Sequence, residues 1–134
     1  MMKMSTVWIG LLLFLIAACS SPTKNFTPAE NGLDAGREFI DACLKGDFSK
    51  ASFYMVDDEK NKQLLLNVEA AYREKDKEGR QELRLASINI KEVSEPNDST
   101  VILYHSNSLD TSAKQTIVIK RNNSWLVNFK QSTK

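Results

Sequence analysis

The sequence predicts an α+β domain in which N-terminal helices pack on a curved four-stranded antiparallel sheet. Up to about residue 72 the apolar residues recur at the spacing of helix faces, and from residue 83 onward they alternate with polar residues. Short clusters of Pro, Asn and Asp separate the alternating segments, which is typical of turns between neighbouring strands. Helices followed by strands along the chain indicate one layer of helices on one layer of sheet.

The chain begins with a segment unlike the rest. Lys3 is the only charged residue among the first 18, and residues 7–18 form an unbroken apolar run. This run is too short for a helix that spans a bilayer, which needs about 20 residues. A basic start, a short apolar run and small residues at its end predict a cleaved secretory signal over residues 1–18.

The end of this segment, Ile16-Ala17-Ala18-Cys19, resembles the lipobox of bacterial lipoproteins. The resemblance implies cleavage before Cys19, a diacylglycerol on its thiol and a further acyl chain, such as palmitate, on its amine. Two or more acyl chains hold a protein durably on a membrane. Ser20 after the cysteine favours the outer membrane of a bacterial cell envelope over the inner one. The alternative is an ordinary cleaved signal that lies beside a cysteine.

Once the signal is set aside, the chain carries 17 basic and 17 acidic residues. This balance argues against a nucleic-acid partner, which normally requires a basic face. With Cys19 acylated, Cys43 has no other cysteine with which to form a disulfide. Residues 19–27 are then the lipidated cysteine and a polar tether with a reach of about 15 Å, and residues 28–131 form one domain.

Capping signals place the first two helices. Thr27-Pro28-Ala29-Glu30 matches a capping box with proline at the first helical position, which predicts that a helix starts here. Apolar residues at helical spacing continue to Leu44, and Gly46 is expected to end the helix in a left-handed conformation. Asp47 then caps a second, short helix that runs to Tyr54.

A third helix is expected to open at Asp57 or Asp58 and to run through Tyr72. It fades in residues 73–82, a tract of mixed charge that is typical of a solvated helix end. Gly79 is the expected stop.

Alternating residues predict four strands. In the first, residues 83–93, the parity of the apolar residues changes, which predicts a bulge near Ser87. The paired asparagines Asn122-Asn123 tolerate positive φ and predict a two-residue hairpin between the last two strands. The other three strands are expected over residues 100–106, 114–120 and 124–131.

Alternation also assigns a face to each strand residue. The residues expected to point toward the helices are Val101, Leu103, His105, Ile117, Ile119, Trp125, Val127 and Phe129. The opposite face carries a second apolar strip, formed by Ile102, Tyr104, Val118 and Leu126. This strip is too apolar for a fully solvated surface, so it favours a homodimer or a partner protein on the outer sheet face.

Two stretches resemble the NTF2-like, or cystatin-like, superfamily. They are Phe39–Ala51, with its Gly-Asp between two helices, and Asn123-Ser124-Trp125-Leu126-Val127 in the final strand. The likeness extends over about residues 28–130 and is greatest to small lipoproteins of that superfamily with no assigned function, some of them described as lumazine-binding. It implies a sheet that bends around the long helix to form a cone, and the open end of this cone is an active site in some members and only a pocket in many others.

His105 is the only histidine and points toward the predicted cone. With Tyr54, Tyr72 and Trp125 it is the expected lining of a pocket, if one exists. Enzymes of the superfamily place an Asp, or an Asp and a His, in this cavity, whereas the acidic residues here fall at caps, in turns and on outer helix faces. No catalytic residue, metal site or cofactor is therefore expected, and isomerase or dehydratase activity is the less favoured alternative.

Two functions follow from these expectations. The first is a membrane-anchored bacterial lipoprotein whose domain is a non-catalytic binding module for a small apolar ligand or an envelope protein. The second is an accessory lipoprotein whose cone is filled by its own side chains and which pairs through the outer sheet face. The volume of the cone distinguishes them, because ligand pockets start near 300 Å³.

Overall fold

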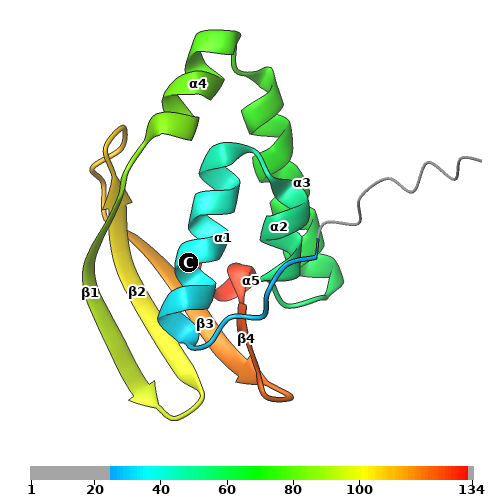
Figure 1. The fold of residues 1–134 in the computed structure, drawn as a ribbon, viewed down its shortest axis with the longest axis vertical. Coiled ribbons are helices and arrows are strands. Elements are labelled where there is room, and N and C mark those ends of the chain that lie inside the picture. The colour runs from blue at the N-terminus through cyan, green and yellow to red at the C-terminus, as the bar shows by residue number, and fades with distance from the viewer. Residues whose placement is uncertain (1–24, 133–134) are drawn as a thin grey trace, which may run out of the picture.

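The computed structural model describes residues 25–132, so Cys19 and the predicted signal segment lie outside the described residues. This part of the chain contains five helices and an open four-stranded antiparallel sheet in the order β1-β2-β3-β4. The helices precede the sheet, apart from a short one at the end (Figure 1). The predicted α+β class, with N-terminal helices packed on a four-stranded antiparallel sheet, is confirmed.

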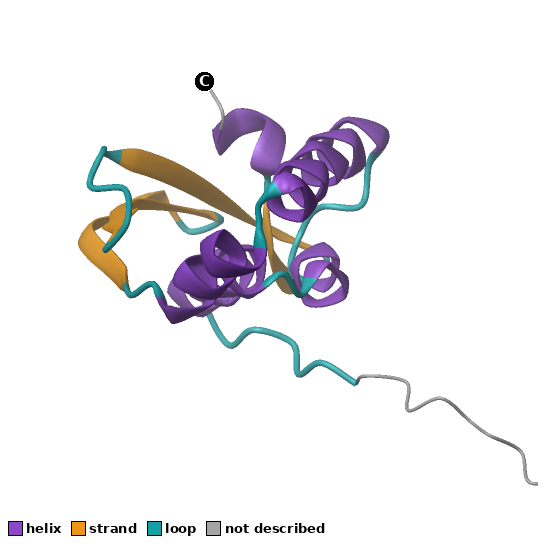
Figure 2. Ribbon diagram, turned by 90° about the horizontal axis from the view of Figure 1, so that it is seen from above, coloured by secondary structure: helices purple, strands orange, loops and turns teal. Residues whose placement is uncertain are grey.

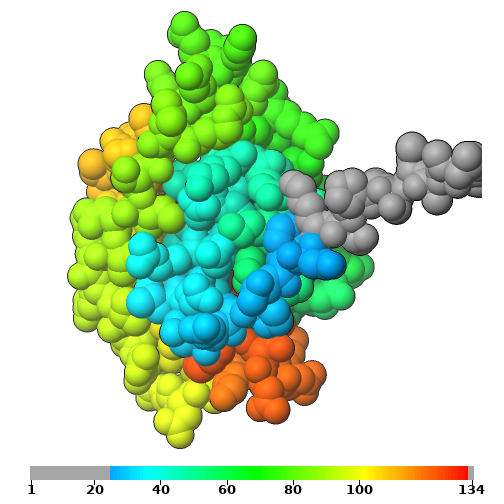
Figure 3. All heavy atoms as spheres, in the orientation of Figure 1, coloured from blue at the N-terminus to red at the C-terminus, as the bar shows by residue number. Residues whose placement is uncertain are grey.

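Helix α1 (Gly32–Lys45) starts later than predicted. Its N-cap is Asn31, whose side chain accepts a hydrogen bond from the Asp34 amide at 2.8 Å, and the Asp34 carboxylate in turn accepts one from the Glu30 amide. Residues 25–31 precede the helix and lie across the α1–α2 side of the molecule (Figure 3). The predicted start at Thr27 is wrong because the Asn31 cap satisfies the first turn instead.

The end of α1 and the next two helices follow their predicted signals. Gly46 caps α1 with φ 72°, and Asp47 caps α2 (Phe48–Phe53) by accepting from the Lys50 amide. Asp58 caps α3 (Glu59–Glu74) by accepting from the Asn61 amide at 2.8 Å. The start of each of these helices depends on a hydrogen bond between residues three positions apart, so it can be predicted from the sequence.

The charged tract after α3 is a separate helix, α4 (Lys77–Leu85), rather than a fading helix end. Asp76 caps it by accepting from the Gly79 amide at 2.7 Å, so Gly79 lies inside the helix and is not a stop. Leu83 and Leu85 therefore belong to α4 and not to the first strand. Their i, i+2 spacing suggested a strand, but the cap at Asp76 starts a helix that includes both.

The sheet is a meander of neighbouring antiparallel strands. The strands are β1 (Ile88–Asn97), β2 (Thr100–Asn107), β3 (Lys114–Arg121) and β4 (Ser124–Val127). The bulge in β1 lies between Ile90 and Glu92 and not near Ser87, which precedes the strand, and a second irregularity lies between Ser94 and Asn97. Asn122 and Asn123 have φ of 51° and 62°, as expected for the predicted hairpin.

The last strand is shorter than predicted. It ends at Val127, and Phe129 lies in α5 (Phe129–Ser132). Asn128, between them, is buried and donates its amide to the Ile117 carbonyl at 2.8 Å. The free edge of β4 is paired with the segment after α2, because Val127 exchanges backbone hydrogen bonds with Tyr54 and Val56. A four-residue strand suffices because this segment covers its edge.

The core lies between α1 and the concave side of the sheet, which curls partly around that helix (Figure 2). Gly36 allows the close approach: a Cβ built there would lie 2.8 Å from Cδ2 of the fully buried Leu103. In β2 the predicted inward residues, Val101, Leu103 and His105, are all buried.

In β3 the predicted faces are reversed. Val118 and Thr116 are buried, whereas Ile117 and Ile119 are half-buried on the outer face with Ile102. The physical reason is the register, since Val118 pairs with Val101 on one side and with Val127 on the other. Directly paired residues of antiparallel strands point to the same face. The outer strip therefore contains Ile117 and Ile119 in place of Val118.

Candidate functional site

A cavity of about 670 Å³ opens between α1, α3, α4 and the ends of β2 and β3. We call it the groove. Its apolar wall consists of Phe39, Ile40, Cys43, Leu44, Val68, Ala71, Leu83, Ala113 and Phe129. Its polar side includes Tyr72, Lys75, His105, Asn107, Lys114, Gln115, Thr116 and Ser132, together with Tyr104, which was predicted for the outer strip. This volume falls in the range of small-molecule sites, and a mostly apolar wall with a few polar groups is their usual composition.

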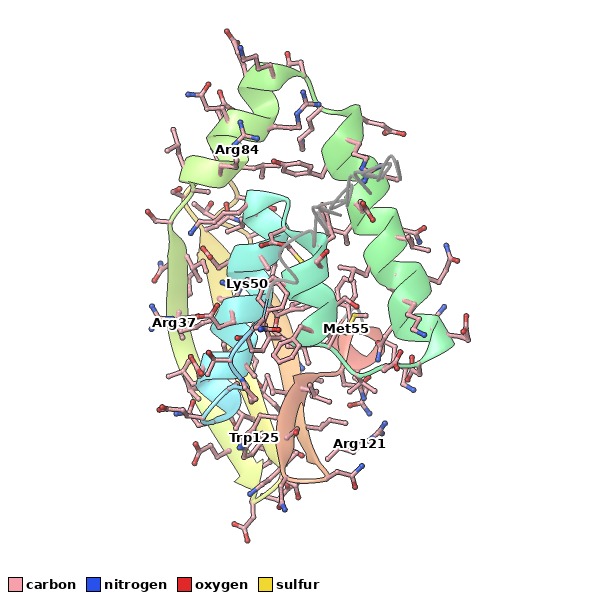
Figure 4. The ribbon with its side chains drawn as sticks, turned by 45° about the vertical axis from the view of Figure 1, so that its right-hand side comes forward. Arg37, Lys50, Met55, Arg84, Arg121 and Trp125 are labelled. Atoms are coloured by element: carbon pink, nitrogen blue, oxygen red, sulfur yellow. The ribbon has the colours of Figure 1, made fainter. Side chains whose placement is uncertain are left out.

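Tyr72 forms one wall of the groove and is fixed from three sides. Its ring meets Phe48 edge-on at a centroid distance of 5.7 Å, and its hydroxyl accepts a hydrogen bond from the Arg84 guanidinium at 2.9 Å. A Cβ built on Gly46 would lie 2.5 Å from Tyr72 Cζ, so the ring packs directly against the end of α1. Figure 4 shows Arg84 at the α4 end of the molecule, where it bridges to α3.

The polar end of the groove contains His105 and Thr116. His105 is 6% exposed, and its Nε2 is 2.8 Å from Thr116 Oγ1, on the neighbouring strand. Burial, and secondarily the charge of Lys114, hold the pKa of His105 below its usual value, so the ring is neutral at pH 7. The hydrogen-bond partner of His105 is thus a hydroxyl group and not a carboxylate that would orient it as a general base.

Cys43 lines the apolar wall from α1. Burial raises the pKa of its thiol to about 12. The thiolate is the nucleophilic form of cysteine, so at neutral pH this side chain acts as a small apolar group.

Three polar side chains at the rim donate rather than accept. The Asn107 side-chain oxygen already accepts from the amides of Leu109 and Asp110, which leaves its NH₂ group for a ligand. Lys114 lies 3.0 Å from the Asp110 carboxylate, and both side chains are about half exposed. Lys75 projects from the end of α3, and no carboxylate among residues 25–132 forms an ion pair with it.

Two of the four predicted pocket residues, Tyr72 and His105, line the groove. Trp125 lies at the opposite end of the molecule from Arg84 (Figure 4), beside Gly32 and with Lys120 Nζ 5.7 Å from its ring centre. Tyr54 is buried beneath the N-terminal segment, where its hydroxyl donates to the Thr27 carbonyl at 2.6 Å. The structure therefore does not bring these two residues to the groove.

A second hollow, of about 650 Å³, lies between α1, α2 and α3 on the other side of Tyr72. Its lining is charged, and most of its charges are neutralised by ion pairs. The pairs are Lys45–Asp41, Lys50–Glu38 and Arg73–Glu69. Burial of a ligand there would break or desolvate these pairs, so the groove is the better binding site.

Among the groove residues that the sequence did not predict, Lys75, Asn107 and Lys114 matter most for its polarity. They come from the end of a helix and from two strand ends beside a loop, and no sequence motif marks such positions. Within residues 25–132 no group of three or more His, Cys, Asp or Glu side chains is arranged to hold a metal ion. No helix in this part of the chain is long and apolar enough to cross a membrane.

Comparison with known proteins adds no assignment. No protein-family model matches the chain, and a search of curated proteins finds no match.

Proposed function

We propose that the chain is a membrane-anchored bacterial lipoprotein of the NTF2-like type whose domain is a non-catalytic binding module. Its ligand is a small, largely apolar molecule that occupies the groove. The observation that carries this proposal is an open cavity of about 670 Å³ with an apolar wall on α1 and α3 and polar side chains from the ends of β2 and β3. The second expected function requires a filled cone, and the open groove favours the first.

Binding rather than catalysis is supported by the chemistry of the groove. His105 is neutral and paired with Thr116, and the Cys43 thiol is protonated. Among residues 25–132, no carboxylate forms a hydrogen bond with His105 and no basic side chain forms one with Cys43. These side chains line the groove but supply no nucleophile.

Two adjacent residues of α3 offer a matched test of the groove. Ala71 lines it and Ala70 does not, and both are exposed. A neutral ten-carbon alcohol that bears a photoreactive diazirine should label peptides of α1 in the full chain. Ala71→Trp fills the groove and should abolish this labelling, whereas Ala70→Trp should leave it intact. Labelling that survives Ala71→Trp, or that never reaches α1, would refute the proposed binding module.

The membrane anchor is tested separately at Cys19. We expect Cys19→Ala to release the protein from the membrane fraction or to leave it there at the mass of the uncleaved chain. If the variant remains in the membrane fraction at the mass of the wild-type mature protein, the lipoprotein interpretation is wrong.

The outer sheet face supports one further role, that of a dimer interface. Ile102, Ile117, Ile119 and Leu126 are only half-buried there, and Ile102 and Ile117 are directly paired. We expect the mass in solution to rise to that of a dimer at high concentration, and Ile117→Lys to prevent this. A wild-type protein that stays monomeric at every concentration would exclude this role.

A further inference from the structure

The polar end of the groove differs from its wall in charge as well as polarity. Among residues 25–132, the only charged side chains that line the groove are those of Lys75 and Lys114, and no carboxylate in this range lines it. Asp110, in the exposed loop before β3, forms an ion pair with Lys114. The apolar wall therefore leads to a rim with an excess of positive charge.

The hydrogen-bonding capacity of this rim is mostly donor capacity. Asn107 has its oxygen occupied by two backbone amides and offers its NH₂ group. Tyr72 accepts from Arg84, so its own hydroxyl proton is available. Lys75 adds an ammonium group that has no ion-pair partner among residues 25–132.

Three other polar groups of the groove have partners within the protein, whereas Gln115 offers both a side-chain donor and an acceptor. The Ser132 hydroxyl donates to the Asn128 carbonyl and accepts from the Ile117 amide. His105 and Thr116 pair with each other. A ligand with a donor head, such as an amine, would meet few acceptors and two ammonium groups, whereas an acceptor head would meet several donors.

From this arrangement we propose that the ligand is an anionic amphiphile, with an acyl-type tail against α1 and α3 and a carboxylate head at Lys75, Lys114 and Asn107. This inference rests on the proposed binding function and specifies its ligand class. Charge complementarity at the rim is its basis, because charge-assisted hydrogen bonds to a carboxylate are about twice as strong as neutral ones. A neutral alcohol of equal tail length fits the apolar wall equally well but gains less at the rim.

The test compares two probes on the full chain in phosphatidylcholine vesicles. A diazirine-bearing decanoic acid is cross-linked to α1, and unlabelled decanoate or decanol competes, with free aqueous concentrations measured for each. We expect decanoate to compete at about three- to tenfold lower concentration than decanol, the size of effect that two solvent-exposed ion pairs supply. The carboxylate must overcome its greater desolvation cost, so a preference for it requires the cationic rim.

Variants assign the preference to the named residues. The double variant Lys75→Gln/Lys114→Gln should abolish the preference for decanoate and leave decanol equally or more potent, because the desolvation cost of the carboxylate is then no longer offset. The matched control Lys77→Gln lies on the exposed side of α4 and outside the groove, and it should keep the preference. A preference that persists in the double variant would overturn the assigned rim.

The remaining outcomes separate this inference from the proposed function. Equal potency of decanoate and decanol in the wild-type chain, or greater potency of decanol, would overturn the anionic class and leave an apolar binding module. Absence of labelling at α1 with both the acid and the alcohol probes would refute the binding module together with this inference.

Discussion

Gly46→Ala is expected to be among the most damaging small substitutions in this domain, because two independent costs fall on one methyl group. Gly46 has φ 72°, where an L-residue is disfavoured by about 1–2 kcal/mol. The new Cβ would also lie 2.5 Å from Tyr72 Cζ and 2.6 Å from Cε1, well inside the normal contact distance.

The ring of Tyr72 has little room to yield, since Phe48 packs against one side of it and Arg84 holds its hydroxyl. Overpacking of this kind costs about 1–3 kcal/mol. Alanine also has less conformational freedom than glycine in the unfolded chain, which offsets about 0.4–1 kcal/mol of this loss in stability. The net loss in the free energy of unfolding is therefore about 2–4 kcal/mol, a large part of the about 5–15 kcal/mol available to a domain.

A double-mutant cycle in urea, followed by far-UV circular dichroism, separates the two costs. Tyr72→Leu removes the atoms that clash, so Gly46→Ala should cost only about 1 kcal/mol in that background, with a coupling energy of about 1–3 kcal/mol. Gly46→Asn tests the backbone term, because Asn tolerates positive φ but carries the same Cβ. A loss for Gly46→Ala below 1 kcal/mol, or the same loss in both backgrounds, would refute this account.

Three further predictions concern buried groups. Asn61 is fully buried and bonds to the Lys130 amide at 2.7 Å and to the Val56 carbonyl, so Asn61→Ala should lower the free energy of unfolding by about 2–4 kcal/mol in urea titrations; a loss under 1 kcal/mol would contradict this. The pKa of His105 is lowered in the folded state, so the unfolded chain binds the extra proton first, and stability should fall as the pH drops below about 6.5. His105→Gln should flatten this dependence of Tm between pH 6.5 and the range where carboxylates titrate, and an unchanged slope would show that another group is responsible. Cys43, with a pKa of about 12, should react with iodoacetamide at pH 8 about a thousandfold more slowly in the folded than in the urea-unfolded chain, and equal rates would show that the thiol is not buried.

The features that the sequence predicted well are those set by nearby residues. Asp47 and Asp58 cap the helices that they were expected to cap, and Asn122-Asn123 makes the hairpin. Each depends on hydrogen bonds or backbone angles within three or four positions. The α+β class follows for a similar reason, since helical and alternating periodicity are read over short windows.

The faces of β3 were wrongly predicted although the chain contains the information. A two-residue loop at Asn122-Asn123 pairs Arg121 with Ser124, and counting back along the strands pairs Val118 with Val127. Because Val127 was placed inward, Val118 had to be inward as well. Alternation alone was ambiguous here, since Ile117, Val118 and Ile119 are three apolar residues in succession.

The groove could be predicted only in part. Tyr72 and His105 were identified from their positions on an inner helix face and an inner strand face, whereas Lys75 and Lys114 depend on where α3 and the loop before β3 end in space. Trp125 shares the inner face of the sheet but lies at the other end of β4 from the groove, beside the start of α1. Strand parity specifies the face on which a side chain lies but not the end of the sheet at which a cavity opens.

Helix α4 shows why the groove was harder to predict from the sequence than the fold class. None of its residues is fully buried, and two polar contacts help to position it: Arg84 to the Tyr72 hydroxyl, and Arg80 to the Lys75 carbonyl at 2.7 Å. Leu83 and Leu85 are the only large apolar residues of α4, and their i, i+2 spacing is that of a strand face rather than of a helix face. Yet this helix supplies Leu83 to the groove, and its contact with Tyr72 holds the opposite wall. One side of the groove is therefore the packed core, and the other side is α4 with its exposed hydrogen bonds. A bound ligand should stabilise the α4 side most, because that side has the fewest buried contacts of its own.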